Sequence, residues 1–441
     1  MVNTIALGIF LFCFIIILFF TFSGKINFAL LLFVPLFPLQ NILDRFQQFP
    51  LGKYFVNIIL VSMMLGWFIR AVFHGEIILE RSFLNKLLIV MVLYTFYSLW
   101  KGYSFLGLPV TLKFDDIRLQ NWKNYMIFPL LFFIVFNNIK NSRQIKQLVV
   151  FMTFAVVLMN YYTIQQLHWL SSPQERARVH GTFVWLGPNE LAAFFATYSF
   201  VLLGIIFFDK SKLRRLFFLV SILLSLYCVV FLFSRGAYLA ILSGMLFFCF
   251  FKAKKLLFPI LIILFFWNTI IPKQVIERIN ETKTEEGVLD ASSERRIIMW
   301  QRAIQLFQES ILTGNGFNTI WFLGFELGDT HNIYLKILAE QGIIGIAILL
   351  ILLCYALFLG IRLYRKTNDN FLKGLGAGFT ACVIAMIIAN MFGDRWTHPQ
   401  VGTYFWVFLA LVARGNKIAQ TQTEVVAVKN KNKNANSPTY K

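Results

Sequence analysis

The chain has 441 residues, of which 58% are hydrophobic and only 14% are charged, and it contains 51 phenylalanines. This composition excludes a water-soluble domain and identifies the lipid bilayer as the solvent of the fold. The net charge of +20 does not indicate nucleic-acid binding. Lysine and arginine stand in short clusters between apolar runs, which is the positive-inside pattern of a membrane protein.

The apolar runs predict an all-α, polytopic transmembrane helical bundle. A spanning helix needs about 20 mainly apolar residues. The candidate runs are 5–22, 26–43, 54–72, 86–104, 124–138, 147–167, 188–207, 214–233, 236–251, 255–271, 332–361, 372–393 and 400–414. We therefore expect about 12 and at most 13 spans. If the number is 12, the segment 26–43 does not cross fully. The first run lacks a following cleavage pattern and is expected to remain as a helix.

The connections between these runs alternate in charge. The basic ones are 70–86, 140–146, 210–215, 252–255, 362–373 and the tail after residue 414. Because cytoplasmic loops carry the excess of basic residues, we assign these to the cytoplasm. The connections 170–188, 234–235, 272–331 and 394–400 then lie on the outer face. We expect the polar tail, 415–441, to be a disordered basic segment in the cytoplasm.

This pattern divides the chain into five segments. They are the N-terminal transmembrane helices 1–146, the transmembrane helices 147–271 with arginines in their outer turns, the long outer loop 272–331, the C-terminal transmembrane helices 332–414, and the tail 415–441. Within the loop, residues 295–307 carry apolar side chains every three or four positions. This spacing predicts an amphipathic helix that rests on the bundle or on lipid headgroups.

The outer turn before the run 188–207 holds the first candidate functional residues. Arg178 and His180 fall on the same side of an extended segment. Pro188 suits a first helical turn, and Asn189 and Glu190 follow it. Glu190 would lie just inside the membrane, so we expect it to pair with an arginine. A structural ion pair and a catalytic carboxylate remain equally open.

Ser234 and Arg235 interrupt two apolar runs with almost no loop between them. Ser234 is placed to cap the next helix, and its free first-turn amides could join the Arg235 guanidinium on one anion. A phosphate or diphosphate is the natural ligand of such a site. The alternative is an arginine that reaches the lipid headgroups from a helix end.

Arg295 and Arg296 begin the amphipathic segment of the long loop. They could bind phosphate, or they could simply solvate the loop helix, and the second interpretation is the more conservative one.

His331 stands at the predicted mouth of the helix 332–361, after Asp329 and Thr330. Eleven residues separate it from Gly342, which is about three helical turns. The two would therefore share a helix face, where glycine lets a neighbouring helix approach. A helix N-terminus disfavours the imidazolium and keeps a ring able to accept a proton. An interfacial histidine beside a helix capped by Asp329 or Thr330 is the alternative.

The remaining polar residues carry weaker signals. Lys336 and Glu340 are one helical turn apart, so we expect them to neutralise each other. Asp394, Arg395 and His398 close the last outer turn and are interpreted as setting orientation. The five cysteines all fall in apolar segments. No metal-ligand spacing, P-loop or dinucleotide fingerprint occurs, so we expect neither a bound metal nor another cofactor.

Four motifs in this order resemble the O-antigen ligase and O-antigen polymerase superfamily, over roughly residues 147–414. The first is Arg178-Val179-His180-Gly181-Thr182-Phe183 with Pro188-Asn189-Glu190-Leu191-Ala192. The second is Ser234-Arg235-Gly236-Ala237-Tyr238-Leu239, which has the family's R-x-x-x-L form. The third is Trp300 followed by Gly314-Asn315-Gly316. The fourth is His331-Asn332-Ile333-Tyr334-Leu335 with Glu340 and Gly342, which has the H-x(10)-G form.

The resemblance implies a metal-independent, inverting glycosyltransferase of the bacterial inner membrane with its active face in the periplasm. Its donor would be a glycan on undecaprenyl diphosphate, and its acceptor a hydroxyl of lipid A-core or of another glycan. Arg178 and Arg235 would hold the diphosphate, and His331 would accept the hydroxyl proton. We place further substrate-binding side chains at His180, Asn189, Glu190, Ser234, Arg295, Arg296, Trp300 and Asn332. Membrane lipids, but no nucleic acid, are the other expected partners.

Three functions fit the resemblance or the hydropathy. We favour an O-antigen ligase over an O-antigen or exopolysaccharide polymerase, which carries the same motifs. The more remote alternative is a transporter of lipid-linked sugar. Transporters place ionisable residues near the membrane midplane, whereas the candidates here crowd the outer boundary, which favours an enzyme.

Overall fold

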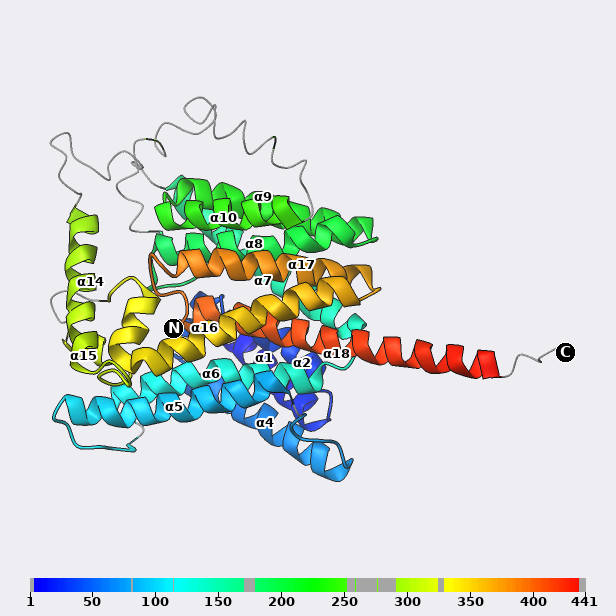
Figure 1. The fold of residues 1–441 in the computed structure, drawn as a ribbon, viewed down its shortest axis with the longest axis horizontal. Helices are drawn as coiled ribbons and strands as arrows, with labels where there is room; N and C mark the ends of the chain where they lie inside the picture. Colours follow the sequence, from blue (N-terminus) through cyan, green and yellow to red (C-terminus); the bar gives the residue numbers. More distant parts are fainter. Residues whose placement is uncertain are drawn as a thin grey trace.

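A computed structural model gives the fold of the chain (Figure 1). It describes residues 4–80, 82–113, 115–169, 179–251, 258, 276, 291–323 and 329–435. In this part of the chain all regular elements are helices, which confirms the predicted all-α class. The α-helices are α1 (Thr4–Phe22), α2 (Ile26–Phe33), α3 (Gln40–Phe46), α4 (Phe55–Phe73), α5 (Phe83–Phe105), α6 (Ile117–Asn138), α7 (Ser142–His168), α8 (Pro188–Phe208), α9 (Lys212–Phe231), α10 (Arg235–Phe251), α14 (Ala291–Glu309), α15 (Thr319–Leu323), α16 (Ile333–Lys366), α17 (Asn370–Ala389) and α18 (Pro399–Ala435).

Eight helices of the described part are long and apolar enough to cross a membrane. A ninth candidate is formed by residues 26–36 and 40–46, two short helices bent by 101°. Such a bend is that of a broken span or a re-entrant loop, and it falls on the segment that a 12-span interpretation leaves uncrossed. The predicted run 255–271 lies almost entirely outside the described residues. The chain is therefore a multi-pass membrane protein.

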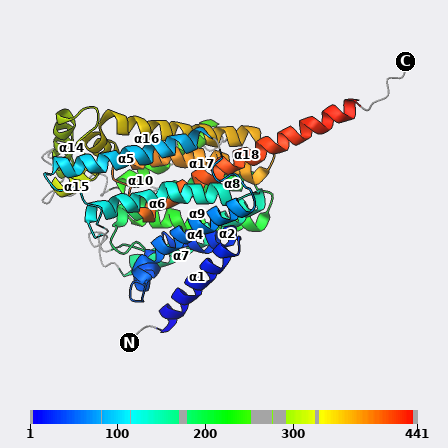
Figure 2. The same ribbon diagram turned by 90° about the horizontal axis from the view of Figure 1, so that it is seen from below.

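The long helices run roughly alongside one another, and α14 lies across one end of the bundle (Figure 1). Seen after a 90° turn, α1 diverges from one side and the C-terminal part of α18 projects beyond the rest (Figure 2). α8 and α17 make the closest helix pair, while α14 packs on α16. The connections that begin α8, α10, α16 and α18 all lie at the α14 end.

Basic connections gather at the opposite end of the bundle. Lys140 pairs with Glu76 at 3.3 Å, and Lys146 pairs with Asp369, just before α17, at 2.9 Å. Lys417 of α18 pairs with Glu80 there as well. Lysines from two of the connections predicted to be cytoplasmic thus pair with acidic residues at one end of the bundle.

Glycine permits the close contact between α8 and α17. A Cβ added at Gly204 would lie 2.4 Å from the Cα of Gly378 and 2.5 Å from the carbonyl oxygen of Gly374. All of these neighbours are backbone atoms, which cannot move aside without separating the helices. Small residues at such crossings let two backbones meet inside a bilayer.

We expect Gly204→Leu to destabilise the bundle by about 1–3 kcal/mol, the usual cost of overpacking. Gly8→Leu is the matched control, because no atom lies within 4 Å of a Cβ at that position. Thermal unfolding of the two variants in detergent would measure the difference. Equal midpoints would contradict the tight α8–α17 contact.

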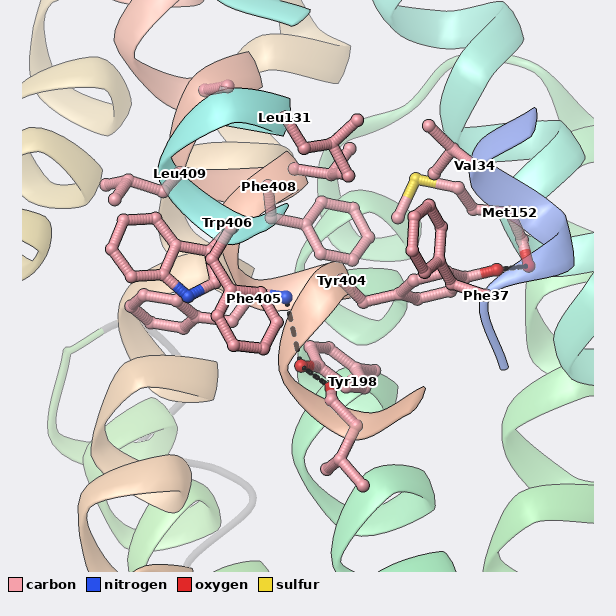
Figure 3. Close-up of a cluster of buried hydrophobic side chains, with 14 of the residues drawn as sticks. Val34, Phe37, Leu131, Met152, Tyr198, Tyr404, Phe405, Trp406, Phe408 and Leu409 are labelled. Carbon is pink, nitrogen blue, oxygen red and sulfur yellow. Dashed lines mark hydrogen bonds between the residues drawn. The ribbon is translucent and has the colours of Figure 1, made fainter. Parts of the chain in front are cut away.

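Aromatic residues fill the centre of the bundle between α8 and α18 (Figure 3). The Tyr198 hydroxyl donates to the Val401 carbonyl at 2.7 Å and accepts from the Phe405 N–H at 2.9 Å. It thereby bridges two backbone groups that an α-helix would normally pair directly. Tyr404 donates to the Met152 carbonyl at 3.0 Å. Buried tyrosines thus satisfy their hydroxyl groups while their rings pack.

The structure differs from the sequence-based expectation in the C-terminal tail. α18 continues past Arg414 to Ala435, where the polar composition predicts disorder. In this stretch the Gln420 side chain donates to Glu424 one turn later, and Lys417 pairs with Glu80. A contact at helical spacing and one tertiary ion pair therefore support the helix, whereas the polar composition of this stretch favours disorder.

Candidate active site

Four connections meet at the α14 end of the bundle. They are 179–187 before α8, 232–234 between α9 and α10, 329–332 before α16, and 390–398 between α17 and α18. Most of the ionisable residues that the sequence singles out lie on these connections or on the first turn of the helix that follows. The elements that carry them are far apart in sequence but neighbours in space (Figure 1).

Three arginines line one small cavity at this end. Arg235 is the first residue of α10, Arg296 comes from α14, and Arg395 comes from the connection after α17. Asn189 and Ser234 contribute to the same cavity. Guanidinium groups offer forked donors that match the oxygens of a phosphate. The cavity is therefore suited to an anion with several oxygens.

Glu190 joins this cavity to α8. Its carboxylate accepts a hydrogen bond from Arg395 at 2.6 Å, and both side chains are largely buried. Pro188 occupies the first turn of α8, as predicted, with Gly187 as the N-cap. The expectation that Glu190 pairs with an arginine is confirmed. Arg235 and Arg296 line the same cavity, so three guanidinium groups surround it.

We expect Glu190→Leu to destabilise the protein by about 3–5 kcal/mol, because it leaves Arg395 charged in a buried position. The more exposed pair between Lys140 and Glu76 is the control, and Lys140→Leu should cost less than about 1 kcal/mol. Thermal unfolding of both variants gives the comparison. If both variants lost only a little stability, the Arg395 guanidinium would have to reach water when Glu190 is absent.

His331 lies in a constrained turn just before α16. Its φ of +50° is unusual for a residue with a side chain. The Trp300 indole N–H donates to the Thr330 carbonyl at 2.9 Å and fixes the turn from α14. Asn332 caps α16 by accepting from the N–H groups of Tyr334 and Leu335. Helix α14 therefore holds the histidine at this position.

The predicted common helix face of His331 and Gly342 is wrong. α16 begins only at Ile333, so His331 precedes the helix, and Gly342 has φ +62° and interrupts it. A Cβ on Gly342 would lie 2.5 Å from the Leu312 carbonyl carbon. The close approach comes from the chain after α14 rather than from another spanning helix.

Charges of both signs act on the His331 imidazole. Burial lowers the pKa of His331 below its ordinary value, the Asp329 carboxylate opposes this, and the guanidinium groups of Arg296 and Arg395 lower it again. Glu190 gives a smaller opposing effect. The net result favours the neutral ring, which can accept a proton at neutral pH. Two of these groups, Arg296 and Arg395, line the arginine cavity.

A second, larger cavity of about 280 Å³ lies next to the same turn. Trp185, Trp321, Lys336, Glu340 and His398 line it, together with several amide side chains. The Trp185 indole meets the His398 ring edge-on at 5.4 Å. The volume of this cavity approaches the roughly 300–1,000 Å³ that is typical of small-molecule sites.

Lys336 pairs with a carboxylate in the connection after α17 rather than with the Glu340 carboxylate. Its ammonium group lies 2.9 Å from an Asp394 oxygen and 3.7 Å from Asp329. Burial raises the pKa of Asp394, but Lys336 and His398 lower it more, so the carboxylate stays ionised. The predicted pairing of Lys336 with Glu340 is therefore wrong as the main contact. Glu340 instead accepts from the Ile320 N–H at 3.3 Å.

Unusual backbone conformations concentrate around the two cavities. Five described residues other than glycine have positive φ, and they are Leu51, Val184, Phe233, Asn318 and His331. All except Leu51 lie in a cavity wall or directly beside it. Such conformations cost about 1–3 kcal/mol each and are found preferentially at functional sites.

The other predicted site residues have varied positions. Arg178 lies outside the described residues. Arg295 is exposed on α14, one position from the cavity-lining Arg296. The His180 ring donates from Nδ1 to the Leu186 carbonyl at 2.9 Å and so shapes the connection that carries Trp185. Trp300 and Asn332, predicted to bind substrate, make the structural contacts described above.

Sequence reasoning assigned Arg395 only an orienting role, whereas the structure places it in the arginine cavity. The signal that could have identified it is its neighbour Asp394, since adjacent opposite charges at a membrane boundary often have separate partners. No group of three or more His, Cys, Asp or Glu residues that could hold a metal ion occurs in the described part of the chain.

Comparison with known proteins gives one match. A family model described as O-antigen ligase matches residues 219–350, from within α9 into α16. The match includes Ser234, Arg235, Arg296, Trp300 and His331. No curated protein is significantly similar to the chain.

Proposed function

We propose that this chain belongs to the O-antigen ligase superfamily, whose model matches residues 219–350, transfers a glycan from undecaprenyl diphosphate to an acceptor hydroxyl and works as an O-antigen ligase. The observation that carries the proposal is the cavity shared by Arg235, Arg296 and Arg395 beside a largely neutral His331. An anion site and a proton acceptor are the two functions that such a transfer requires from the protein.

In the proposed reaction the acceptor hydroxyl oxygen attacks the anomeric carbon of the donor glycan. His331 removes the hydroxyl proton as the new carbon–oxygen bond forms. The bond between the anomeric carbon and the diphosphate oxygen breaks, and its electron pair leaves with the diphosphate. Arg235 and Arg296, joined by Arg178 from the outer turn, stabilise that negative charge. One displacement inverts the anomeric configuration and needs no metal.

The α14 end is assigned to the periplasmic face of the bacterial inner membrane. Basic connections at the opposite end support this orientation, because they belong to the cytoplasm. A topology of 12 or 13 spans keeps the tail in the cytoplasm. In that topology α14 is part of a periplasmic loop that covers the site. Cysteine labelling from either side of the membrane would test the assignment.

Reconstitution tests the enzyme against a lipid-linked sugar transporter. Purified protein in sealed vesicles is supplied with carrier-linked glycan and lipid A-core on one face, without an ion gradient. An enzyme forms the joined product and releases undecaprenyl diphosphate. Movement of intact donor across the bilayer with no joined product would establish a transporter instead.

Polymerase activity is the second candidate, because both activities belong to the superfamily that the motifs indicate. The surface polysaccharide of a deletion strain separates them. Loss of every O-antigen chain from lipid A-core is expected for a ligase. A single repeat unit still attached to the core would establish a polymerase and overturn the ligase assignment.

A further inference from the structure

The 280 Å³ cavity is chemically unlike the arginine cavity. Four amide side chains, Asn121, Asn124, Asn318 and Gln341, contribute to its wall, and so do Trp185 and Trp321. Each of these two indoles is 57% exposed. Amide groups donate and accept hydrogen bonds without a net charge. Exposed indoles provide flat apolar faces beside them.

The cavity wall carries one lysine, Lys336, and one acidic residue, Glu340. Lys336 also contacts Asp394 and Asp329, so acidic groups more than offset its positive charge. No excess of positive charge is present here for a phosphate, whereas three arginines line the other cavity. The wall therefore favours an uncharged ligand with many hydroxyl groups.

Asn318 supplies the most specific observation. Its Nδ2 atom is buried and makes no hydrogen bond. The residue also has φ +63°, which costs energy for a side chain other than glycine. A buried amide donor without a partner is unfavourable by about 1–3 kcal/mol, unless a ligand or water supplies an acceptor. Because Nδ2 has almost no accessible surface, the Asn318 side chain has to rotate before it can donate to a ligand hydroxyl in the cavity.

From these features we propose that the cavity lined by Trp185, Trp321 and Asn318 binds a neutral sugar ring, whose carbon–hydrogen face lies on an indole and whose hydroxyls pair with the amides. Its position supports the role of a substrate subsite. Lys336 in its wall contacts Asp329, and Asp329 acts on His331. The wall also includes Ile333, two residues after His331, and Trp396, the neighbour in sequence of the cavity arginine Arg395.

The substrate role rests on the proposed glycan transfer, but sugar binding itself does not. The ring could belong to the acceptor, whose hydroxyl reacts, or to the donor, whose anomeric carbon is attacked. Kinetics distinguishes them, because the loss of a subsite raises the KM of the substrate that uses it.

Binding is measured by saturation-transfer NMR on the full chain in lipid nanodiscs free of glycoside detergents. The probes are methyl glycosides of glucose, galactose, mannose, rhamnose and N-acetylglucosamine. At least one should give a signal with the wild-type protein. Trp321→Ala should weaken its binding roughly tenfold, and Asn318→Ala roughly threefold to tenfold. Trp321→Phe keeps an aromatic face and should retain most of the binding.

Trp169→Ala is the matched control, since Trp169 is 85% exposed and lines neither cavity. Arg235→Lys should also leave glycoside binding unchanged. No signal from any glycoside, or an equal signal from Trp321→Ala, overturns the subsite. Wild-type protein that binds a glycoside but joins no glycan keeps the subsite and overturns the proposed function. In the transfer assay, an increased KM of the acceptor or of the donor identifies the ring, and unchanged values overturn its substrate role.

Discussion

Replacing His331 by alanine is expected to abolish glycan transfer and to lower kcat by roughly 10²- to 10⁴-fold, the usual contribution of a general base. The side chain lies in a turn that is fixed by Trp300 and Thr330, and Asn332 caps α16 without it. Folded protein should therefore remain in the membrane. The transfer assay measures the loss, and surface glycan in a complemented deletion strain provides the cellular readout.

His74→Ala is the control for this variant, because His74 is an exposed histidine at the end of α4. It should transfer glycan at the wild-type rate. Normal surface glycan in the His331→Ala strain, with protein present in the membrane, would remove the proton-transfer role.

The pH profile supplies a second test of His331. The base is active when neutral, and its pKa is lowered from 6.5, so transfer should fall on acidification with a midpoint below pH 6.5. Asp329 raises this pKa, and its neutralisation in Asp329→Asn should move the midpoint to still lower pH. A midpoint above pH 6.5 in the wild type, or a shift to higher pH in the variant, would contradict the assigned electrostatics.

Hydropathy alone predicts much of the fold, because burial in lipid demands long apolar helices. The helical class follows from composition, and the bend between residues 26–36 and 40–46 falls on the segment that a 12-span topology leaves uncrossed. Hydropathy cannot give the break at Gly342, which arises from a backbone that approaches from the distant chain after α14. It also cannot give the helix after Arg414, where a tertiary contact with Glu80 outweighs polar composition.

The candidate site shows a similar division. Local motifs identify Arg235, Glu190 and His331, since each stands at the boundary of an apolar run. Local motifs do not identify Arg395, because its partner Glu190 lies about 200 residues away in sequence. Local motifs also cannot reveal the 280 Å³ cavity, because its walls come from five separate parts of the chain.

The second large effect is expected at Arg235. Arg235→Lys keeps the positive charge but loses the guanidinium fork, which holds two phosphate oxygens at once. If Arg235 stabilises the leaving diphosphate, kcat should fall by roughly 10²-fold. The fall should appear in kcat more than in KM, because the charge on the diphosphate oxygen grows as the bond breaks.

Helix α14 provides the matched control for this substitution. Arg296 lines the arginine cavity, and Arg295, its neighbour, is exposed. Arg296→Lys should therefore lower kcat as Arg235→Lys does, whereas Arg295→Lys should leave transfer near the wild-type rate. Near-normal transfer by Arg235→Lys would mean that this arginine only reaches the lipid headgroups. The other two arginines of the cavity, Arg296 and Arg395, would then hold the diphosphate.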